Sequence, residues 1–498
     1  MPFLTQLCRW AAERPHELAV AVGKESLSWA ELRTSAEALL QGVPDGGYNV
    51  LRERNSVDFI RRWVAGISGT RRCAVLDSSL PEAQLRDVLR QLNRSWGAEN
   101  PLALAEDHRE GGRRGGDTVV VHHHRQDVAP ALDDGAQDSL FLLALTSGTS
   151  SLPKAIIRTR ASWAASFTAS AEFFGVRPDD VTLAPGPLSS GLSLYALSEC
   201  LYSGSAFRTV EQADVGEIHD AIEHDGVTRL VLVPALLRLL AERGIAAGAD
   251  AGGLRSIVAA GAKLDPRTLE AARRWAPQAT IFEYYGAQEL SFVSGTRLDP
   301  QDPVDAQTLV STSVGTPFPS VEIAVLDPDG EPLAEGVTGS IAVSSPMVSE
   351  GYLWGDDSQA FTRRGSWCTV HDQGYLSEGR LHFLGRASDM INTAGLNVYP
   401  QEVERALSAL PGVELALVTG VPDPVRGQRL VAAVRMGHSG LGSGQLRMGL
   451  ADLLDARKLP QEYYELREAP LTERGKPSRA MLRDWIAEGD PRTPRMRP

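Results

Sequence analysis

The sequence predicts an α/β protein with a large N-terminal domain and a smaller C-terminal domain. Up to about residue 300, short apolar runs typical of buried strands alternate with stretches that have helical spacing. After residue 310 strands follow one another without intervening helices, and from about residue 386 a small α+β pattern begins. The chain has 498 residues, which at roughly 100–200 residues per domain allows two to four domains.

The N-terminal part alternates between expected strands and helices. Ser28 and Glu31 have capping-box spacing, so a helix is expected over 28–41. Apolar runs predict strands at 73–76, 140–145, 230–233, 256–260 and 280–282. Stretches with helical spacing lie between many of them, at 159–173, 214–224, 234–243 and 265–275. Buried strands that alternate with helices predict parallel sheet.

The remaining sequence predicts a change of architecture. Residues 321–326 alternate, Asp-Pro-Asp-Gly at 327–330 predicts a turn, and 340–343 predicts a further strand, so antiparallel pairing is expected. The last part predicts, in order, helix 400–409, strands 413–419 and 429–435, helix 444–456, strand 463–468 and helix 477–487. We place domains at 1–386 and 387–490, and expect a disordered tail at 491–498 because proline and charge oppose packing.

Composition excludes several classes of partner. The net charge of −13 disfavours nucleic acid and anionic membrane surfaces, because the mean field repels phosphates. No apolar stretch of about 18 residues predicts a membrane span, and no signal peptide is evident. The scattered cysteines predict reduced thiols, at Cys8, Cys73, Cys200 and Cys368. We therefore expect a cytoplasmic protein, and the sequence leaves its oligomeric state open.

Several familiar motifs are missing, among them GxxxxGK[ST], GxGxxG, GxSxG and HExxH. The run from His122 to His124 offers metal ligands, but consecutive residues on a strand point to opposite faces. A solvated strand end is therefore the favoured interpretation.

The strongest local signal is the segment 145–154, which reads LTSGTSSLPK. It follows an apolar strand and precedes a stretch with helical spacing. Small residues let backbone N–H groups approach phosphate oxygens, hydroxyls add donors, and Lys154 supplies a positive charge. On this segment alone, a polar Ser/Thr loop without a ligand is the alternative.

This segment resembles the TSGTTGxPKG signature of the adenylate-forming superfamily, which comprises acyl- and aryl-CoA synthetases, peptide-synthetase adenylation domains and luciferases. Further segments resemble the family's YGxTE, TGD, hinge and PxTxxGK motifs, at 283–289, 371–374, 385–404 and 470–476. Five collinear motifs at family spacing are highly specific. The resemblance implies a large N-terminal domain of mixed sheets with flanking helices and a distorted antiparallel barrel, and a small mobile C-terminal domain.

The resemblance implies that a carboxylate attacks the α-phosphate of ATP, giving acyl-AMP and pyrophosphate. Such a reaction needs the protein mainly to position anions and neutralise charge. ATP or AMP contacts are implied for Thr146, Ser147, Gly148, Thr149, Lys154, Gly261, Ala262, Tyr284, Tyr285, Gly286, Asp372 and Arg386. Asp372 would accept hydrogen bonds from the ribose hydroxyls, with Arg386 nearby. Adenine would lie between the ring of Tyr285 and the backbone of 261–263.

Catalytic roles are implied for Lys476, Glu289 and Gln288. Lys476 would bridge the substrate carboxylate and the α-phosphate, and only its place in PxTxxGK outweighs the ordinary interpretation as a solvated lysine. Glu289 would hold Mg²⁺, a hard cation that prefers carboxylate and phosphate oxygens. The C-terminal domain would then swing so that a hinge and a loop serve the thiol acceptor, with roles implied for Ser388, Asp389, Gly395 and Asn397.

Departures from the family pattern concern the loops and the acid pocket. Ser151 and Ala155 replace glycines of the phosphate loop, and His371 replaces the glycine before the motif aspartate. Gln288 stands where a threonine usually bonds a phosphate, and its longer side chain can reach toward the acid. The acid pocket is placed at Ser189, Ser190 and Gly191, where many acyl-CoA synthetases carry an aromatic residue or histidine.

No acid lies in 183–196 to pair with a substrate ammonium, which argues against an amino acid substrate. The small polar residues leave room for a polar ring, so a small aryl acid is favoured and a short or medium acyl acid follows. The leading hypothesis is an acid–CoA ligase that uses ATP, Mg²⁺ and CoA. Alternatives are transfer to a carrier-protein thiol in trans or to an amine, and activation of another oxyanion such as nitrite.

A third hypothesis, a non-catalytic nucleotide-binding protein, belongs to another class. A decayed site should lose its charged residues first, and this chain keeps Lys154, Glu289, Asp372, Arg386 and Lys476. The charged set therefore favours an enzyme.

Overall fold

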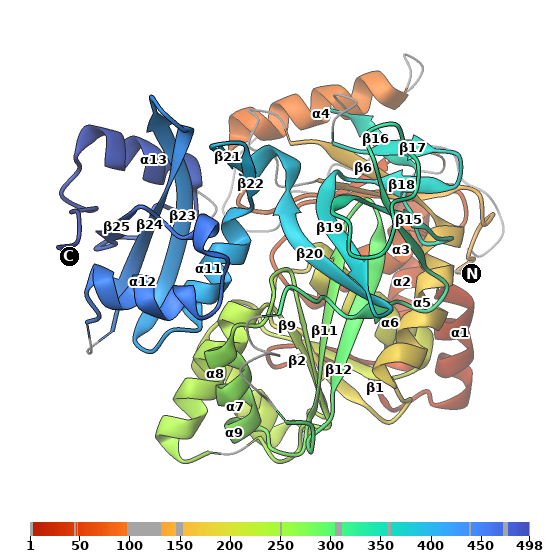
Figure 1. The fold of residues 1–498 in the computed structure, drawn as a ribbon. Helices are drawn as coiled ribbons and strands as arrows, with labels where there is room; N and C mark the ends of the chain where they lie inside the picture. The colour runs from red at the N-terminus through yellow and green to blue at the C-terminus, as the bar shows by residue number, and fades with distance from the viewer. Residues whose placement is uncertain are drawn as a thin grey trace.

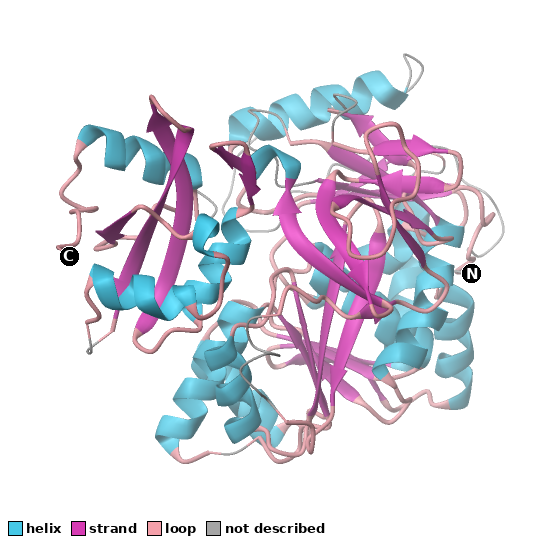
Figure 2. Ribbon diagram, viewed as in Figure 1, coloured by secondary structure: helices cyan, strands magenta, loops and turns pink. Residues whose placement is uncertain are grey.

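The computed structural model describes residues 3–43, 46, 48–96, 131–145, 153–249, 251–303, 311–355, 360–437, 440–471 and 477–497. Within these ranges the chain forms four β-sheets, three before residue 387 and one after it. Figure 1 shows the last part, in blue, as a separate body beside the larger one. Figure 2 shows that helices flank the sheets of both bodies. None of the described helices is long and apolar enough to cross a membrane.

The first sheet has nine strands among the described residues and carries most of the predicted parallel pairing. Its order is β13 (Thr316–Pro317), β12 (Ser291–Leu298), β11 (Thr280–Ala287), β10 (Ser256–Ala260), β9 (Arg229–Leu232), β7 (Val181–Leu183), β8 (Ala206–Thr209), β1 (Leu18–Val22) and β2 (Glu25–Ser28). All pairs from β11 to β1 are parallel, whereas the strands at both edges pair antiparallel. Strands buried on both faces form the centre, as the apolar runs predicted.

Helices cover both faces of this sheet. One face packs against α7 (Val215–His224), α8 (Pro234–Ala247) and α9 (Pro266–Trp275). The other face packs against α1 (Leu4–Glu13), α2 (Trp29–Leu39), α3 (Val57–Gly66), α5 (Arg160–Phe174) and α6 (Gly191–Ser203). The capping box of Ser28 and Glu31 is present at the start of α2. Proline at the first helical position begins α8 and α9, which fits its fixed backbone angle.

The second sheet carries the segment that resembles a phosphate loop. Its order is β16 (Gly351–Trp354), β6 (Ala155–Thr159), β5 (Leu140–Leu145), β4 (Arg72–Val75) and β3 (Tyr48–Leu51), with α4 (Glu82–Trp96) packed on one face. Leu145 pairs with Ala155 in antiparallel register, so the two flanks of the segment lie side by side. The predicted helix at 159–173 is present as α5, and strand β6, which the sequence analysis did not predict, lies between the segment and this helix. The apolar pattern of 155–157 continues the sheet rather than opening the helix.

The third sheet is antiparallel and lies where the sequence placed the distorted barrel. Its order is β17 (Thr362–Arg364), β18 (Trp367–Thr369), β15 (Gly339–Ser344), β19 (Asp372–Ser377) and β20 (Arg380–Arg386), with β14 (Glu322–Leu326) paired to β15. The predicted strands at 321–326 and 340–343 pair antiparallel, as expected.

The C-terminal body has the predicted α+β pattern. Its sheet contains β22 (Leu396–Val398), β21 (Ile391–Thr393), β24 (Gly427–Met436), β23 (Val413–Asp423) and β25 (Glu462–Glu465). One face packs against α11 (Pro400–Ser408) and α12 (Ser443–Ala451), and the other against α13 (Arg479–Glu488). Short 3-10 helices complete the described chain, η1 (Leu40–Gly42), η2 (Ala387–Asp389) and η3 (Ala456–Lys458).

The predicted disordered tail is wrong for residues 491–497. Thr493 is buried, the Met496 amide donates to the Tyr463 carbonyl over 2.8 Å, and the Glu465 amide donates to the Pro494 carbonyl over 2.9 Å. The segment therefore lies along β25 and satisfies that strand's edge. Proline and charge opposed a packed core in the prediction, but backbone pairing with an existing strand needs little apolar surface.

The two bodies meet through α11. Arg405 of α11 donates to the Phe383 carbonyl on β20 over 3.0 Å and to the Ser311 carbonyl over 3.4 Å. Strand β20 ends at Arg386, and the next strand, β21, belongs to the C-terminal sheet. We therefore propose the boundary between the domains at 386/387.

Candidate functional site

The predicted adenine contacts gather at the carboxyl ends of β10 and β11. Gly261 and Ala262 follow β10 directly and are exposed, and Ala260 pairs with Tyr284 on the neighbouring strand. Gly261 has a φ of +89°, a conformation that a side chain would strain. Ligands of open α/β sheets bind at such strand ends. The structure therefore brings the 261–262 turn beside Tyr284, Tyr285 and Gly286, as the sequence predicted.

Lys263, the next residue in this turn, has a structural contact. Its ammonium lies 3.2 Å from Glu283 Oε2 and donates to the Ser313 carbonyl over 2.7 Å. The other carboxylate oxygen of Glu283 accepts the Leu264 amide over 2.6 Å. These bonds fix the turn after β10 against β11.

The predicted ribose contacts also meet. The Tyr285 hydroxyl donates to Asp372 Oδ2 over 2.6 Å, and the Arg386 Nε lies 3.6 Å from Asp372 Oδ1. The Tyr285 ring packs on the Phe383 ring at 5.2 Å between centroids. Two segments far apart in the sequence, strand β11 and the hairpin of β19 and β20, thus form one cluster.

Asp372 is a buried carboxylate with spare acceptor capacity. Its side chain is 7% exposed, and within the described part of the chain Oδ1 has no hydrogen-bond donor. Burial raises the pKa of Asp372, against the lowering effects of the Tyr285 hydrogen bond and the Arg386 charge. Burial and the Asp372 charge in turn raise the pKa of Tyr285, which keeps its hydroxyl protonated. The free oxygen is suited to accept a hydroxyl donor from a ligand.

A second cluster forms around Glu289. The Tyr352 hydroxyl donates to Glu289 Oε1, and the Lys154 ammonium lies 5.6 Å from the centroid of the Tyr352 ring. Lys154 is the last residue of the predicted phosphate loop. The structure therefore places that lysine and Glu289 on either side of one tyrosine, which the sequence analysis did not identify.

The backbone of the turn that carries Gln288 and Glu289 is fixed by hydrogen bonds to its carbonyl groups. Arg158 donates to the carbonyls of Gln288 and Met347, the latter over 2.8 Å, and the Ser349 amide donates to the Glu289 carbonyl over 2.8 Å. Arg158 is 6% exposed, and burial lowers its pKa to about 10. Sequence analysis missed this arginine because an arginine in a strand carries no local sign that its partners are distant carbonyls.

The predicted acid pocket lies where α6 begins. Ser190 is the N-cap of α6 and accepts the Ser193 amide over 3.3 Å, so it has a structural role there. A methyl group at Gly191 would lie 3.4 Å from Gln288 Nε2. The Gln288 side chain therefore reaches the start of α6 beside Ser189, which agrees with the prediction that it points toward the acid pocket.

A carboxylate further along α6 is paired with an arginine. Glu199 of α6 lies 2.7 Å from Arg229 of β9, and both side chains are 1% exposed. Tyr284 packs nearby on Phe292, with ring centroids 4.7 Å apart. The carboxylate of Glu199 is thus neutralised by Arg229, and the rings of Tyr284 and Phe292 form an aromatic pair.

The predicted hinge residues lie at the junction of the two bodies. The Ser388 hydroxyl donates to Asp389 Oδ1 over 3.3 Å within η2. Arg479 of α13 donates to Asp389 Oδ2 over 3.0 Å and lies 2.6 Å from Glu404 of α11. Arg479 thus ties the junction to two helices of the C-terminal body, a role that the sequence analysis did not predict.

The predicted thiol loop is an exposed hairpin. Ala394 and Gly395 both have positive φ, +51° and +80°, and they connect β21 to β22. Paired positive φ angles are typical of a tight two-residue hairpin turn. Asn397 on β22 accepts a hydrogen bond from Asn392 across the hairpin over 2.9 Å.

Some predicted site residues lie outside the described residues. They are Thr146, Ser147, Gly148, Thr149, Ser151, Lys476 and the run from His122 to His124. Their roles stay predictions from the sequence.

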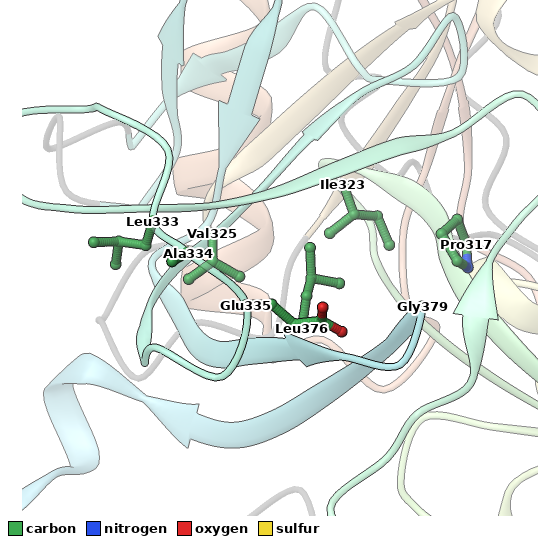
Figure 3. Close-up of a pocket in the computed structure, with 8 residues that line it drawn as sticks. All are labelled: Pro317, Ile323, Val325, Leu333, Ala334, Glu335, Leu376 and Gly379. Atoms are coloured by element: carbon green, nitrogen blue, oxygen red, sulfur yellow. The ribbon is translucent and has the colours of Figure 1, made fainter.

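A pocket elsewhere on the described surface does not serve this site. It lies over the third sheet, lined by aliphatic side chains such as Ile323, Val325, Leu333 and Leu376 with a single carboxylate, Glu335 (Figure 3). None of the predicted site residues lines it. The chemistry described above is therefore concentrated at the junction of the first three sheets.

Comparisons with known proteins agree with this geometry. The chain matches the AMP-binding enzyme family over residues 7–353 and the C-terminal domain of AMP-binding enzymes over residues 402–476. It is 31% identical to an uncharacterized acyl–CoA ligase of Bacillus subtilis, over 73% of this chain and 71% of the relative. It is 30% identical to the 2-succinylbenzoate–CoA ligase of Geobacillus kaustophilus, over 94% of this chain and 95% of the relative.

Among solved structures, the amide bond synthetase McbA of Marinactinospora thermotolerans is similar, with a TM-score of 0.81 and 26% identity. The match covers 97% of this chain and 100% of that structure. The o-succinylbenzoate CoA synthetase of Bacillus subtilis shares the fold, with a TM-score of 0.76 and 23% identity, over 97% of this chain and 98% of that one. Sequence match, fold and the clustered residues agree. The chain therefore belongs to the AMP-binding enzyme family, within the adenylate-forming superfamily.

Proposed function

We propose that this enzyme is an acid–thiol ligase that uses ATP to convert a carboxylic acid, by preference a small aryl acid, to an acyl-AMP and then transfers the acyl group to CoA. The observation that carries the proposal is the buried Asp372 oxygen that lacks a donor among the described residues, beside Tyr285 and the strand-end turn at Gly261. A nucleoside would supply the missing donor through its ribose and lay its base in the turn.

The phosphates of ATP would extend toward the second cluster. Lys154 would contact phosphate oxygens together with Thr146, Ser147, Gly148 and Thr149 of the same loop. Glu289 fits Mg²⁺, since that cation commonly binds one or two carboxylates together with substrate phosphates. Such a cation neutralises phosphate charge.

Adenylation itself would depend on Lys476. Its ammonium would lie between the substrate carboxylate and the α-phosphate and reduce their mutual repulsion. The C-terminal domain would then move about the Ser388–Asp389 junction, withdraw Lys476, and bring Gly395 and Asn397 to the thiol. The exposed hairpin at Gly395 supports this part, because a turn without a side chain allows a pantetheine arm to approach.

The aryl preference rests on the pocket and on one relative. Gln288 Nε2 reaches the start of α6 at Gly191, and the aromatic rings of Tyr284 and Phe292 pack on each other nearby. Glu199 is neutralised by Arg229, which disfavours a substrate ammonium in this region. The 2-succinylbenzoate–CoA ligase, which matches over nearly the whole chain, is named for an aryl acid.

The experiment combines two assays over a panel of aryl, alkyl and amino acids, with nitrite as a further arm. Acid-dependent exchange of pyrophosphate into ATP reports adenylation, and mass spectrometry with and without CoA reports thioester. We expect exchange with small aryl acids and thioester only with CoA. Lys476→Ala should abolish exchange while thioester formation from supplied acyl-AMP survives. No exchange with any acid would disprove the proposal.

A second candidate acceptor is an amine. The observation that favours it is the similarity to the amide bond synthetase over 97% of this chain. Adding a primary amine in place of CoA distinguishes the two, because an amide product that forms faster than the thioester would make the amine the acceptor. A carrier-protein thiol is tested in the same way with a phosphopantetheinylated carrier in place of CoA.

A further inference from the structure

Strand β16 connects the two sides of the second cluster. Tyr352 donates its hydroxyl to Glu289, while Lys154 lies over the ring of the same residue. Trp354 Nε1 donates to the Pro153 carbonyl over 3.0 Å, next to Lys154 in the chain. Gly355 has a φ of +83°, and a methyl group there would lie 2.9 Å from Lys154 Cγ. Two residues of β16 and the glycine after it therefore lie against the lysine segment.

Pairing within the sheet fixes the position of β16. Tyr352 pairs with Ile156 of β6, and a register shift follows before Trp354 pairs with Ala155. Such a bulge turns the strand locally and re-aims its side chains. Tyr352 and Trp354 contact neighbouring residues of the segment that precedes β6, Lys154 and Pro153 respectively.

Glu289 is held at several points. Ser349 donates its amide to the Glu289 carbonyl, and Arg158 holds the adjacent Gln288 carbonyl, so the backbone is fixed. The side chain is oriented by the Tyr352 hydroxyl on Oε1, and among the described residues no donor reaches Oε2. A hydrogen bond to an ionised carboxylate is among the stronger ones, so it restricts the carboxylate to one rotamer. The hydrogen bond from Tyr352 to Oε1 therefore also fixes the direction in which Glu289 Oε2 points.

We propose that Tyr352 is a positioning residue that sets the Glu289 carboxylate for a divalent cation and the Lys154 ammonium for phosphate at a fixed mutual distance. This inference rests on the proposed function, because it assigns the cation to Glu289. The hydroxyl and the ring have separable tasks. The hydroxyl orients the carboxylate, and the ring supports the ammonium through a cation–π contact.

The test measures ATP affinity by calorimetry on the full chain, with Mg²⁺ and with EDTA. Tyr352→Phe keeps the ring, so ATP affinity in EDTA should stay within about twofold of wild type while the Mg²⁺-dependent gain falls about tenfold. Tyr352→Leu removes both contacts and should weaken ATP binding in EDTA as well. Tyr202→Phe is the matched control, since its hydroxyl contacts Thr168 of α5, which is not a predicted site residue, and should change neither value.

A double-mutant cycle with Glu289→Gln separates orientation from general damage. In the Glu289→Gln background, Tyr352→Phe should cause no further loss of the Mg²⁺-dependent gain. A wild-type protein whose ATP affinity is the same with Mg²⁺ and EDTA would disprove the cation site, and with it the proposed role of Glu289. A normal wild-type gain that Tyr352→Phe leaves unchanged would overturn only the positioning role.

Discussion

The Tyr285 hydroxyl donates to Asp372 Oδ2 over 2.6 Å and so joins strand β11 of the first sheet to strand β19 of the third. The bond leaves Oδ1 of the same carboxylate buried without a donor among the described residues. One oxygen is thus used by the fold, and the other stays available to a ligand. This division makes the pair a sensitive place to test the proposed nucleotide site.

Replacing Tyr285 by phenylalanine should weaken AMP binding about tenfold at neutral pH. The hydroxyl favours the ionised form of Asp372, so its loss raises the pKa of that carboxyl further. Because the ribose contact needs the ionised carboxylate, the deficit in affinity should shrink as the pH is raised from neutral into the alkaline range. Calorimetric titration of AMP over this range checks the prediction, and an equal deficit at every pH would contradict it.

Asp372→Asn should stabilise the unliganded protein while weakening ATP binding. Burial raises the pKa of Asp372 above the ordinary value of 3.8. At pH values between the ordinary pKa of the unfolded chain and the raised pKa of the folded protein, the folded state binds more protons than the unfolded state. The carboxyl's contribution to stability therefore falls as pH rises. Asparagine does not titrate, so it should add on the order of 1 kcal/mol to the free energy of unfolding at pH 7.5.

Guanidinium unfolding checks this prediction at several pH values. The advantage of Asp372→Asn should shrink as the pH is lowered to and below 3.8, because the wild-type carboxyl becomes protonated in both states only below its ordinary pKa. A wild-type protein that is the more stable of the two at pH 7.5 would show that the carboxylate serves the fold and not a ligand.

Arg158→Met should cost about 3 kcal/mol of unfolding free energy. The substitution leaves the buried Met347 carbonyl and the part-buried Gln288 carbonyl without their donor, so the turn before Glu289 loses its support. Chemical denaturation measures the loss. Arg297→Met is the control, because its pair with Asp299 is exposed and should contribute little. Equal effects of the two substitutions would refute the supporting role.

Gly191→Ala should raise KM for ring-shaped acids about tenfold and leave KM for ATP unchanged. The new methyl group would meet Gln288 Nε2 at 3.4 Å, in a helical position where alanine is well tolerated. Gln288→Ala in the same protein should restore space for the ring. Pyrophosphate exchange with benzoate-type acids measures both, and a change confined to KM for ATP would place the acid elsewhere.

Arg479→Gln should make the junction between the domains more accessible. The arginine fixes Asp389 of η2 to Glu404 of α11, and the nearby Arg386 side chain is 70% exposed. Trypsin should therefore cut after Arg386 several times faster in the variant, as read by mass spectrometry of the fragments. Arg467→Gln removes an exposed pair with Glu465 and should leave the rate unchanged. No difference between the two variants would argue against the tether.

Much of the fold could be predicted because local patterns and burial agree. The Ser28 capping box, the buried runs of β9 and β10, and the helix–strand order of the C-terminal body all appear as expected. Predictions failed where strand pairing, rather than local amino-acid composition, determined the structure. Strand β6 was not predicted, because its place between the strand at 140–145 and the helix at 159–173 depends on pairing with β5, and the tail is ordered by its backbone bonds to β25.

The sequence by itself determined the chemical inventory of this protein, namely a hydroxyl-rich segment, a lysine and the acids and tyrosines in a fixed order along the chain. Only the tertiary structure decided which of them act together. It bonded Tyr285 to Asp372, and it seated Tyr352 between Lys154 and Glu289. The physical reason is that these residues come from segments that are distant in the sequence, and the bonds to Asp372 and Glu289 also join separate sheets. Their geometry comes from strand register and sheet packing, whereas sequence spacing constrains only neighbours along the chain.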